Sequence, residues 1–253
     1  MKDGLNMENE TAQTESLQKT DNTKALKDLV INIIFPTIVL NNAGKYLGEH
    51  GGVKALIVAL AIPLGYAAYD LVKNSNKNLI AAIGFVSLLL TGGLGLLQLE
   101  GFWFAVKEAG IPLLIGLIVL GSAFSRKPLV KLFIFNKALM QTEKIKEALK
   151  ANNRELMFEK LLKKTTFLLS LSFFLSSLIN YKLAINIFKD IPAHLSEAAR
   201  SELLNQQIAE MTWQGYVIML IPSMVSMGLI LWYLSKGIEK HTGYSFNDVI
   251  KHE

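Results

Sequence analysis

Six long apolar segments, separated by short charged stretches, restrict the fold of this chain more than any other feature of its sequence. An α-helix rises about 1.5 Å per residue, so about 20 apolar residues are enough to cross the hydrocarbon core of a bilayer. The sequence therefore predicts an all-α, polytopic integral membrane protein with about six transmembrane helices. The predicted spans are residues 29–47, 54–72, 79–99, 103–124, 165–188 and 213–234.

The basic residues are distributed unevenly over the segments between these spans. If the N-terminus lies in the cytoplasm, 20 of the 26 Lys and Arg residues fall in cytoplasmic segments, and eleven of them belong to residues 126–164. Cytoplasmic loops of membrane proteins carry such an excess of positive charge. An even number of spans then predicts that both termini are cytoplasmic.

These boundaries divide the chain into five parts. The first is polar, mixed in charge and without the apolar stretch of a signal peptide, which is typical of a disordered tail. The predicted parts are a disordered cytoplasmic tail (1–27), transmembrane helices one to four (28–124), a basic, amphipathic, helical cytoplasmic loop (125–164), transmembrane helices five and six (165–235) with an outside helical loop at 189–211, and a cytoplasmic tail (236–253).

Two of the loops carry apolar residues at helical spacing among charged ones. In the cytoplasmic loop, where Asn153 is a candidate N-cap, they are Ile145, Leu149, Leu156 and Leu161. Such a pattern fits helices lying on the anionic inner leaflet, and equally a solvated helix that only leads into the fifth span. In the outside loop, Leu195, Leu203, Leu204 and Ile208 are predicted to lie along the outer membrane interface.

Three charged residues interrupt the apolar sequence around the third and fourth spans. Glu100 is expected near the outer surface, while Lys107 and Glu108 are expected about 8–9 Å inside the fourth helix. A charge in the bilayer is costly, so Lys107 is predicted to pair with Glu100 or Glu108, or with Asn41 or Asn42. This candidate polar cluster is either a structural clasp or part of a substrate or proton path, and the clasp is favoured.

A polar stripe follows helical spacing on the fifth predicted span, at Ser172, Ser176 and Asn180. The favoured interpretation is hydrogen bonding between helices, or serine hydroxyls that bond back to their own helix. The alternative is the lining of a hydrated cavity. Together with the charges of the fourth span, such a lining would suit a small transporter or channel.

The residue types needed for several kinds of chemistry are missing or scattered. The sequence has no cysteine, and its four histidines are far apart, so we predict no metal site and no cofactor. No nucleophile with a base or paired carboxylates lies within a span, so we predict no catalytic residues and no enzyme. The basic residues follow the predicted topology, which argues against nucleic acid as a partner.

Part of the chain resembles a known family. The residues that carry the resemblance are Thr91-Gly92-Gly93-Leu94, Glu100, Lys107, Ser122, Phe124 and Lys127-Pro128-Leu129. Their spacing matches without a gap from Gly92 to Leu129, with Glu100 in the place of the family's usual aspartate. They are similar to the central region of the intracellular septation protein A family, the inner-membrane-spanning YciB-like proteins of Gram-negative bacteria. The family usually has a Trp-Lys-Pro-Thr run where this chain has Val106-Lys107-Glu108-Ala109, so the chain looks like a member of a sister group.

The resemblance implies a location and a broad role. Family members are placed in the bacterial inner membrane and are connected with cell division and envelope maintenance, without an assigned chemical activity. We therefore expect a non-enzymatic envelope protein whose partners are the lipid bilayer and, as further alternatives, other inner-membrane proteins or a second copy of the chain. A transporter or channel that uses Lys107 and Glu108 is the alternative function.

Overall fold

The computed structural model describes residues 26–27, 29–73, 79–97, 99, 101–136 and 139–251. Every regular element of these residues is a helix, and one isolated bridge pairs Met140 with Ile250. The chain forms two compact units: the first holds Met1–Trp103 and Ile187–Gln214, and the second holds Phe104–Asn186 and Gly215–Glu253. The division falls within two of the long helices and at the end of a third.

The described residues contain four helices that are long and apolar enough to cross a membrane. These are α3 (Gly51–Lys73, apolar over Gly51–Tyr69), α5 (Gly101–Phe124), α8 (Glu155–Ile187) and α9 (Glu197–Thr242). A further apolar stretch, Ile83–Leu96 of α4 (Leu79–Leu96), is shorter. The outward faces of these helices carry large exposed apolar side chains such as Leu114, Ile118 and Ile221, as expected of a membrane protein.

The first predicted span, residues 29–47, is not among these four helices. It consists of a π-helical turn η1 (Val30–Ile34), a short α2 (Phe35–Asn42) and a 3-10 turn η2 (Ala43–Tyr46). Pro36 explains the change of type, because it has no N–H and its ring displaces the carbonyl four residues earlier. The N–H of Phe35 donates instead to the carbonyl of Val30, which is the wider bond of a π-helix.

Two helices are much longer than the spans that the sequence predicts. Helix α8 has 33 residues and α9 has 46, so they measure about 50 Å and about 69 Å. A hydrocarbon core is about 30 Å thick, and only part of each helix fits within it. The helix predicted in the outside loop is present from Glu197 on. It is not separate from the following span but continuous with it, because neither glycine nor proline interrupts residues 197–214.

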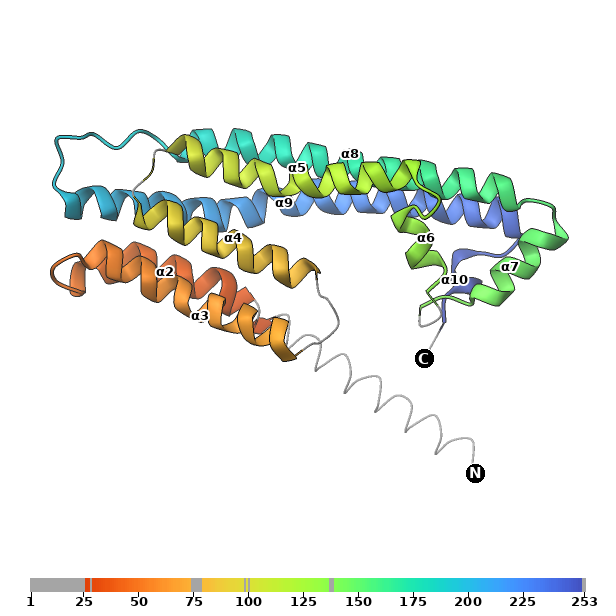
Figure 1. Ribbon diagram of the computed structural model, residues 1–253, viewed down its shortest axis with the longest axis horizontal. Helices are drawn as coiled ribbons and strands as arrows, with labels where there is room; N and C mark the ends of the chain where they lie inside the picture. Colours follow the sequence, from red (N-terminus) through yellow and green to blue (C-terminus); the bar gives the residue numbers. More distant parts are fainter. Residues whose placement is uncertain are drawn as a thin grey trace, which may run out of the picture. The chain divides into compact units, whose positions relative to one another are not determined.

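In the first unit, α3 packs against α2 and α4, and the N-terminal part of α9 packs on α3 (Figure 1). Gly92 and Gly95 of α4 face Leu60 and Leu56 of α3, so small residues let these helices approach closely. Of the side chains predicted at the outer interface, Leu204 and Ile208 are buried, whereas Leu203 is exposed and Leu195 is partly buried. The α9 segment thus contributes to a protein core.

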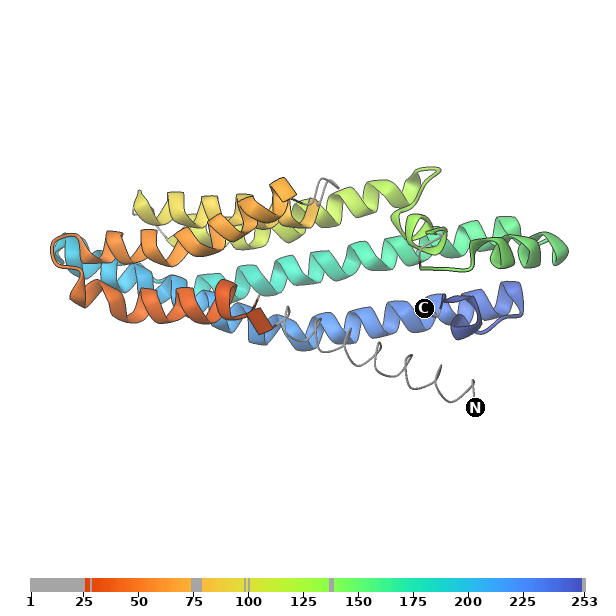
Figure 2. The same ribbon diagram turned by 90° about the horizontal axis from the view of Figure 1, so that it is seen from below.

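In the second unit, α6 (Leu129–Ile134), α7 (Thr142–Ala151) and α10 (Phe246–Val249) gather around the start of α8 and the end of α9, as both ribbon views show (Figures 1 and 2). They enclose a hydrophobic core that includes Ile145, Leu149 and Leu161. Three of the four apolar residues of the predicted cytoplasmic stripe are thus buried within the chain, and Leu156 is exposed. We call this group of helices the helical cap.

Candidate functional site

Lys107 and Glu108 of α5 form an ion pair with each other. The Lys107 Nζ lies 2.6 Å from the Glu108 Oε1, and the two side chains are 9% and 24% exposed. Adjacent residues of a helix do not share a face, so both side chains must bend toward one another. Each of the two charges is therefore neutralised by a residue of the same helix, and no residue of another helix is needed.

The other members of the predicted polar cluster are placed as follows. Glu100 lies outside the described residues. Asn41 and Asn42 are exposed on α2, and the Asn42 side-chain amide donates to the backbone carbonyl of Ile38 at 3.0 Å. Within the predicted cluster, the structure therefore pairs Lys107 with Glu108, and the Asn42 amide bonds to its own helix.

The helix turn that follows the ion pair is where α5 meets α8. Pro112 has no N–H to donate to the Glu108 carbonyl. The hydroxyl of Ser177 on α8 donates to the next carbonyl, that of Ala109, at 2.8 Å. Two turns beyond Ala109, a Cβ added to Gly116 would lie 2.7 Å from the ring of Phe174, so the α5 backbone lies directly against α8. These polar and small residues hold two apolar helices together.

The predicted stripe on α8 bonds mainly to its own helix. The hydroxyls of Ser172 and Ser176 donate to the carbonyls of Leu169 and Ser172 at 2.8 and 2.9 Å, and Asn180 is partly buried. This is the behaviour expected of serine within an apolar helix. The stripe therefore gives no sign of lining a hydrated cavity.

A second row of polar side chains on α8 is buried, unlike the predicted stripe. It was not predicted from the sequence. Thr166, Ser170 and Ser177 are each at most 8% exposed. Thr166 accepts a hydrogen bond from the N–H of Val130 at 3.3 Å, and Ser177 bonds to α5 as described above. Their spacing of four and seven residues places them on one helix face, and that spacing is the signal that could have found them.

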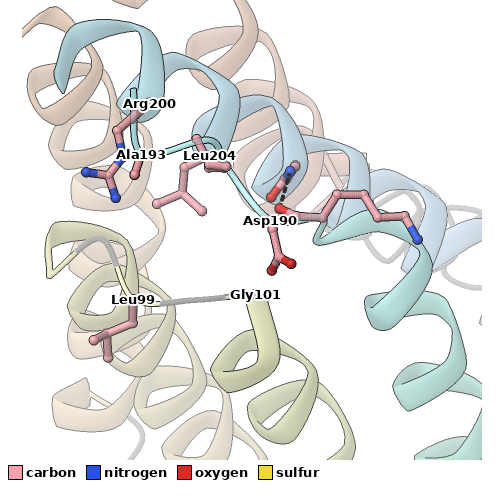
Figure 3. A pocket seen from close by; sticks show the side chains of 9 residues that line it. Leu99, Gly101, Asp190, Ala193, Arg200 and Leu204 are labelled. Atoms are coloured by element: carbon pink, nitrogen blue, oxygen red, sulfur yellow. Dashed lines mark hydrogen bonds between the residues drawn. The ribbon is translucent and has the colours of Figure 1, made fainter. Parts of the chain in front are cut away.

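A cavity of about 360 Å³ lies in the first unit, where the start of α5, the segment after α8 and the first turns of α9 meet (Figure 3). Its walls include the charged side chains of Lys189, Asp190 and Arg200 and the amide of Gln207. The Gln207 Nε2 donates to the carbonyl of Lys189 at 3.1 Å and fixes the segment after α8 to α9. Sequence analysis did not single out any of these residues.

A second cavity of about 360 Å³, in the second unit, is mostly basic. It lies between the end of α5 and the start of α8 and is lined by Arg126, Pro128, Lys131, Glu159, Leu162 and Lys163. Lys131 pairs with Glu159 at 2.9 Å, which leaves two cations without a carboxylate among the side chains that line it. Basic groups next to the ends of apolar helices are suited to anionic lipid headgroups.

Within the described part of the chain, no group of three or more His, Cys, Asp or Glu residues could hold a metal ion. Comparison of the chain with family models, with curated proteins and with solved structures finds no match. The resemblance to the septation protein A family therefore rests on the motif residues of the sequence alone.

Proposed function

We propose that this chain is a bacterial inner-membrane protein that acts without catalysis, through contacts with lipid and with other membrane proteins, in envelope maintenance or division. The observation that carries the proposal is the ion pair between Lys107 and Glu108. A charge reserved for a transported solute has to be available to it, whereas these two charges neutralise each other. The resemblance from Gly92 to Leu129 supports the location and the role.

The proposal includes six crossings, with both termini in the cytoplasm. Residues 29–47 and 79–99 would supply the two crossings beyond the four long apolar helices, and the excess of basic residues sets the direction. In this topology the basic cavity at Arg126, Lys131 and Lys163 lies at the inner leaflet, where anionic lipids would be attracted to it.

This topology has a direct test, because the natural sequence contains no cysteine. We expect a single cysteine introduced at Glu197 to react with a membrane-impermeant maleimide in intact cells. A single cysteine at Ser245 should react only after the cells are permeabilised. Labelling of both positions in intact cells, or of Ser245 alone, would exclude a cytoplasmic C-terminus.

A small transporter or channel is the second candidate, favoured by one observation. Glu108 keeps a quarter of its side chain exposed, and Pro112 leaves its backbone carbonyl without a helical donor. The two functions can be separated in a strain from which the gene is deleted. The Lys107→Met and Glu108→Gln variants are expressed in it at matched amounts of folded protein, and the recovery of normal behaviour is compared. Lys182→Gln, at an exposed position of α8, is the control.

Under the non-catalytic proposal, both variants restore normal envelope and division behaviour once folded protein is matched. Failure of either variant, with normal folding and with a functional Lys182→Gln protein, would replace the proposal by the transport function. Uptake assays in proteoliposomes would then follow.

A further inference from the structure

The cavity of the first unit has walls that the fold holds in place. At Gly101, where α5 begins, an added Cβ would lie 2.8 Å from the Cβ of Phe188 and 2.9 Å from its carbonyl oxygen. The start of α5 therefore lies directly on Phe188, the first residue after α8. The hydrogen bond from Gln207 to the Lys189 carbonyl holds the other wall. A cavity between such fixed walls is suited to a small ligand.

Unsatisfied polar atoms are concentrated at this cavity. Within the described residues, four buried side-chain atoms have no hydrogen-bond partner, and two of them, the Arg200 Nε and the Gln207 Oε1, belong to residues of the cavity wall. Native proteins rarely leave such atoms unpaired, so each one requires an explanation. Both atoms belong to polar groups of the cavity wall, and the guanidinium that carries the Arg200 Nε also offers terminal N–H groups to an acidic ligand.

The charges of the cavity have both signs. The structure gives the partly buried Arg200 guanidinium no ion pair or side-chain hydrogen bond among the described residues. The same holds for the carboxylate of Asp190, which is exposed. Figure 3 shows Arg200 on the Leu99 side of the cavity and the Asp190 carboxylate directed toward Gly101. The two opposite charges thus share one cavity without neutralising each other.

We propose that this cavity binds a small zwitterion, whose acidic group pairs with Arg200 and whose primary ammonium group pairs with Asp190. A planar guanidinium favours carboxylate or phosphate oxygens, and a carboxylate accepts from an ammonium group. A simple anion would pair only with Arg200, and a simple cation only with Asp190, whereas a zwitterion pairs with both. Phosphoethanolamine, free or as the headgroup of phosphatidylethanolamine, has both groups at a short separation.

This binding site goes beyond the proposed function, because binding is measured on purified protein and does not depend on the role in the envelope. The probe is O-phosphoethanolamine, titrated calorimetrically into the full-length protein in detergent, with inorganic phosphate and ethanolamine as half-ligands. We expect Arg200→Gln and Asp190→Asn each to weaken binding of the probe about tenfold or more. Lys182→Gln, which lies outside the cavity, should bind like the parent.

Native mass spectrometry then shows whether the ligand is a lipid headgroup or a free solute. For this measurement the protein is taken from mixed phosphatidylethanolamine and phosphatidylglycerol. Retention of phosphatidylethanolamine that Arg200→Gln and Asp190→Asn abolish assigns the site to a lipid headgroup, and binding of the soluble probe alone assigns it to a free solute. The proposal is overturned if inorganic phosphate binds as tightly as the probe and Asp190→Asn has no effect. It is equally overturned if neither probe nor lipid binds. Melting curves of both variants verify that they are folded.

Discussion

The side-chain amide of Asn205 donates to the backbone carbonyl of Gly52 at 2.7 Å and joins α9 to the start of α3. The approach is close, because a Cβ added to Gly52 would lie 2.5 Å from the Cβ of Ser201. Asn205 is only 3% exposed, so its amide has no water to bond with. This contact makes the polar first part of α9 a component of the first unit.

Replacing Asn205 by alanine should destabilise the first unit. The substitution removes a buried hydrogen bond and leaves space at a tight helix contact, and we expect a loss of about 1–3 kcal/mol in the free energy of unfolding. Thermal melting in detergent measures the effect. The control is Asn186→Ala, because the exposed Asn186 amide donates to the Lys182 carbonyl of its own helix. Equal melting temperatures for the two variants would contradict the assignment.

Removing both charges of the α5 ion pair should be less harmful than removing one. Lys107→Met leaves Glu108 as a lone charge in an apolar helix, and Glu108→Gln leaves Lys107. A lone charge costs up to about 2.5–3.5 kcal/mol at the bilayer centre and less toward the interface. The double variant leaves none, so its folded yield should exceed that of either single variant. Additive losses would show that the two side chains do not stabilise each other.

Two neighbouring serines of α8 should respond differently to substitution by alanine. Ser177 donates to the Ala109 carbonyl of α5, whereas Ser176 donates to the Ser172 carbonyl of its own helix. Hydrogen bonds between membrane helices contribute about 0.6 kcal/mol on average and up to about 1.7 kcal/mol. Ser177→Ala should therefore lower stability in a detergent unfolding titration by this amount, and Ser176→Ala should leave it nearly unchanged. The reverse order would assign the α5–α8 contact to the predicted stripe.

These serines show where sequence periodicity stops being informative. Ser172, Ser176 and Asn180 lie on one helix face, and so do Thr166, Ser170 and Ser177. Spacing alone cannot choose between two faces, because the choice depends on where α5 and α6 pack. The long apolar helices could be predicted from the sequence, since length and composition determine whether a helix can cross a bilayer. The π-helical turn before Pro36 and the continuity of α9 depended on local backbone geometry.

Asn153 shows the same limit at a helix end. Asn153 lies between α7 and α8, but the role of N-cap that the sequence suggests for it is wrong. Asn153 has a φ of 52° and ends α7: its N–H donates to the Lys150 carbonyl, and the Arg154 N–H donates to the Leu149 carbonyl. This pair of bonds is a Schellman motif, in which asparagine tolerates the left-handed conformation that usually requires glycine. The residue types that favour a helix start and a helix end overlap.

The helical cap predicts a contrast between two residues of one apolar stripe. Ile145 is fully buried in the core of the cap, and Leu156 is 75% exposed. Ile145→Ala should cost about 2–5 kcal/mol, because it removes buried methyl groups and leaves a cavity. Leu156→Ala should change stability little. Chemical denaturation of the protein in detergent tests both. If Leu156→Ala instead weakened binding to anionic vesicles, the stripe would also contact lipid.

Asp248 gives the cap a dependence on pH. Hydrogen bonds from the Ser245 side chain and backbone, with a smaller contribution from Lys144, hold the pKa of Asp248 below its ordinary value of 3.8. Ser245 and Asp248 form the capping box of α10. A lowered pKa in the folded state means that the ionised carboxylate stabilises the fold at all pH values above 3.8. That stabilisation is lost as the pH falls below 3.8 and through the lower folded-state pKa.

Hydrogen exchange of the α10 amides, followed from pH 7 downward and corrected for the intrinsic exchange rate, measures this loss. We expect protection to be constant down to about pH 4 and to fall below it. Asp248→Asn should show reduced protection already at neutral pH, and little further loss on acidification, because asparagine does not titrate. Lys146→Gln, at an exposed pair with Glu143 on α7, is the control and should follow the parent profile. A parent profile that does not change with pH would exclude the carboxylate as the stabilising group.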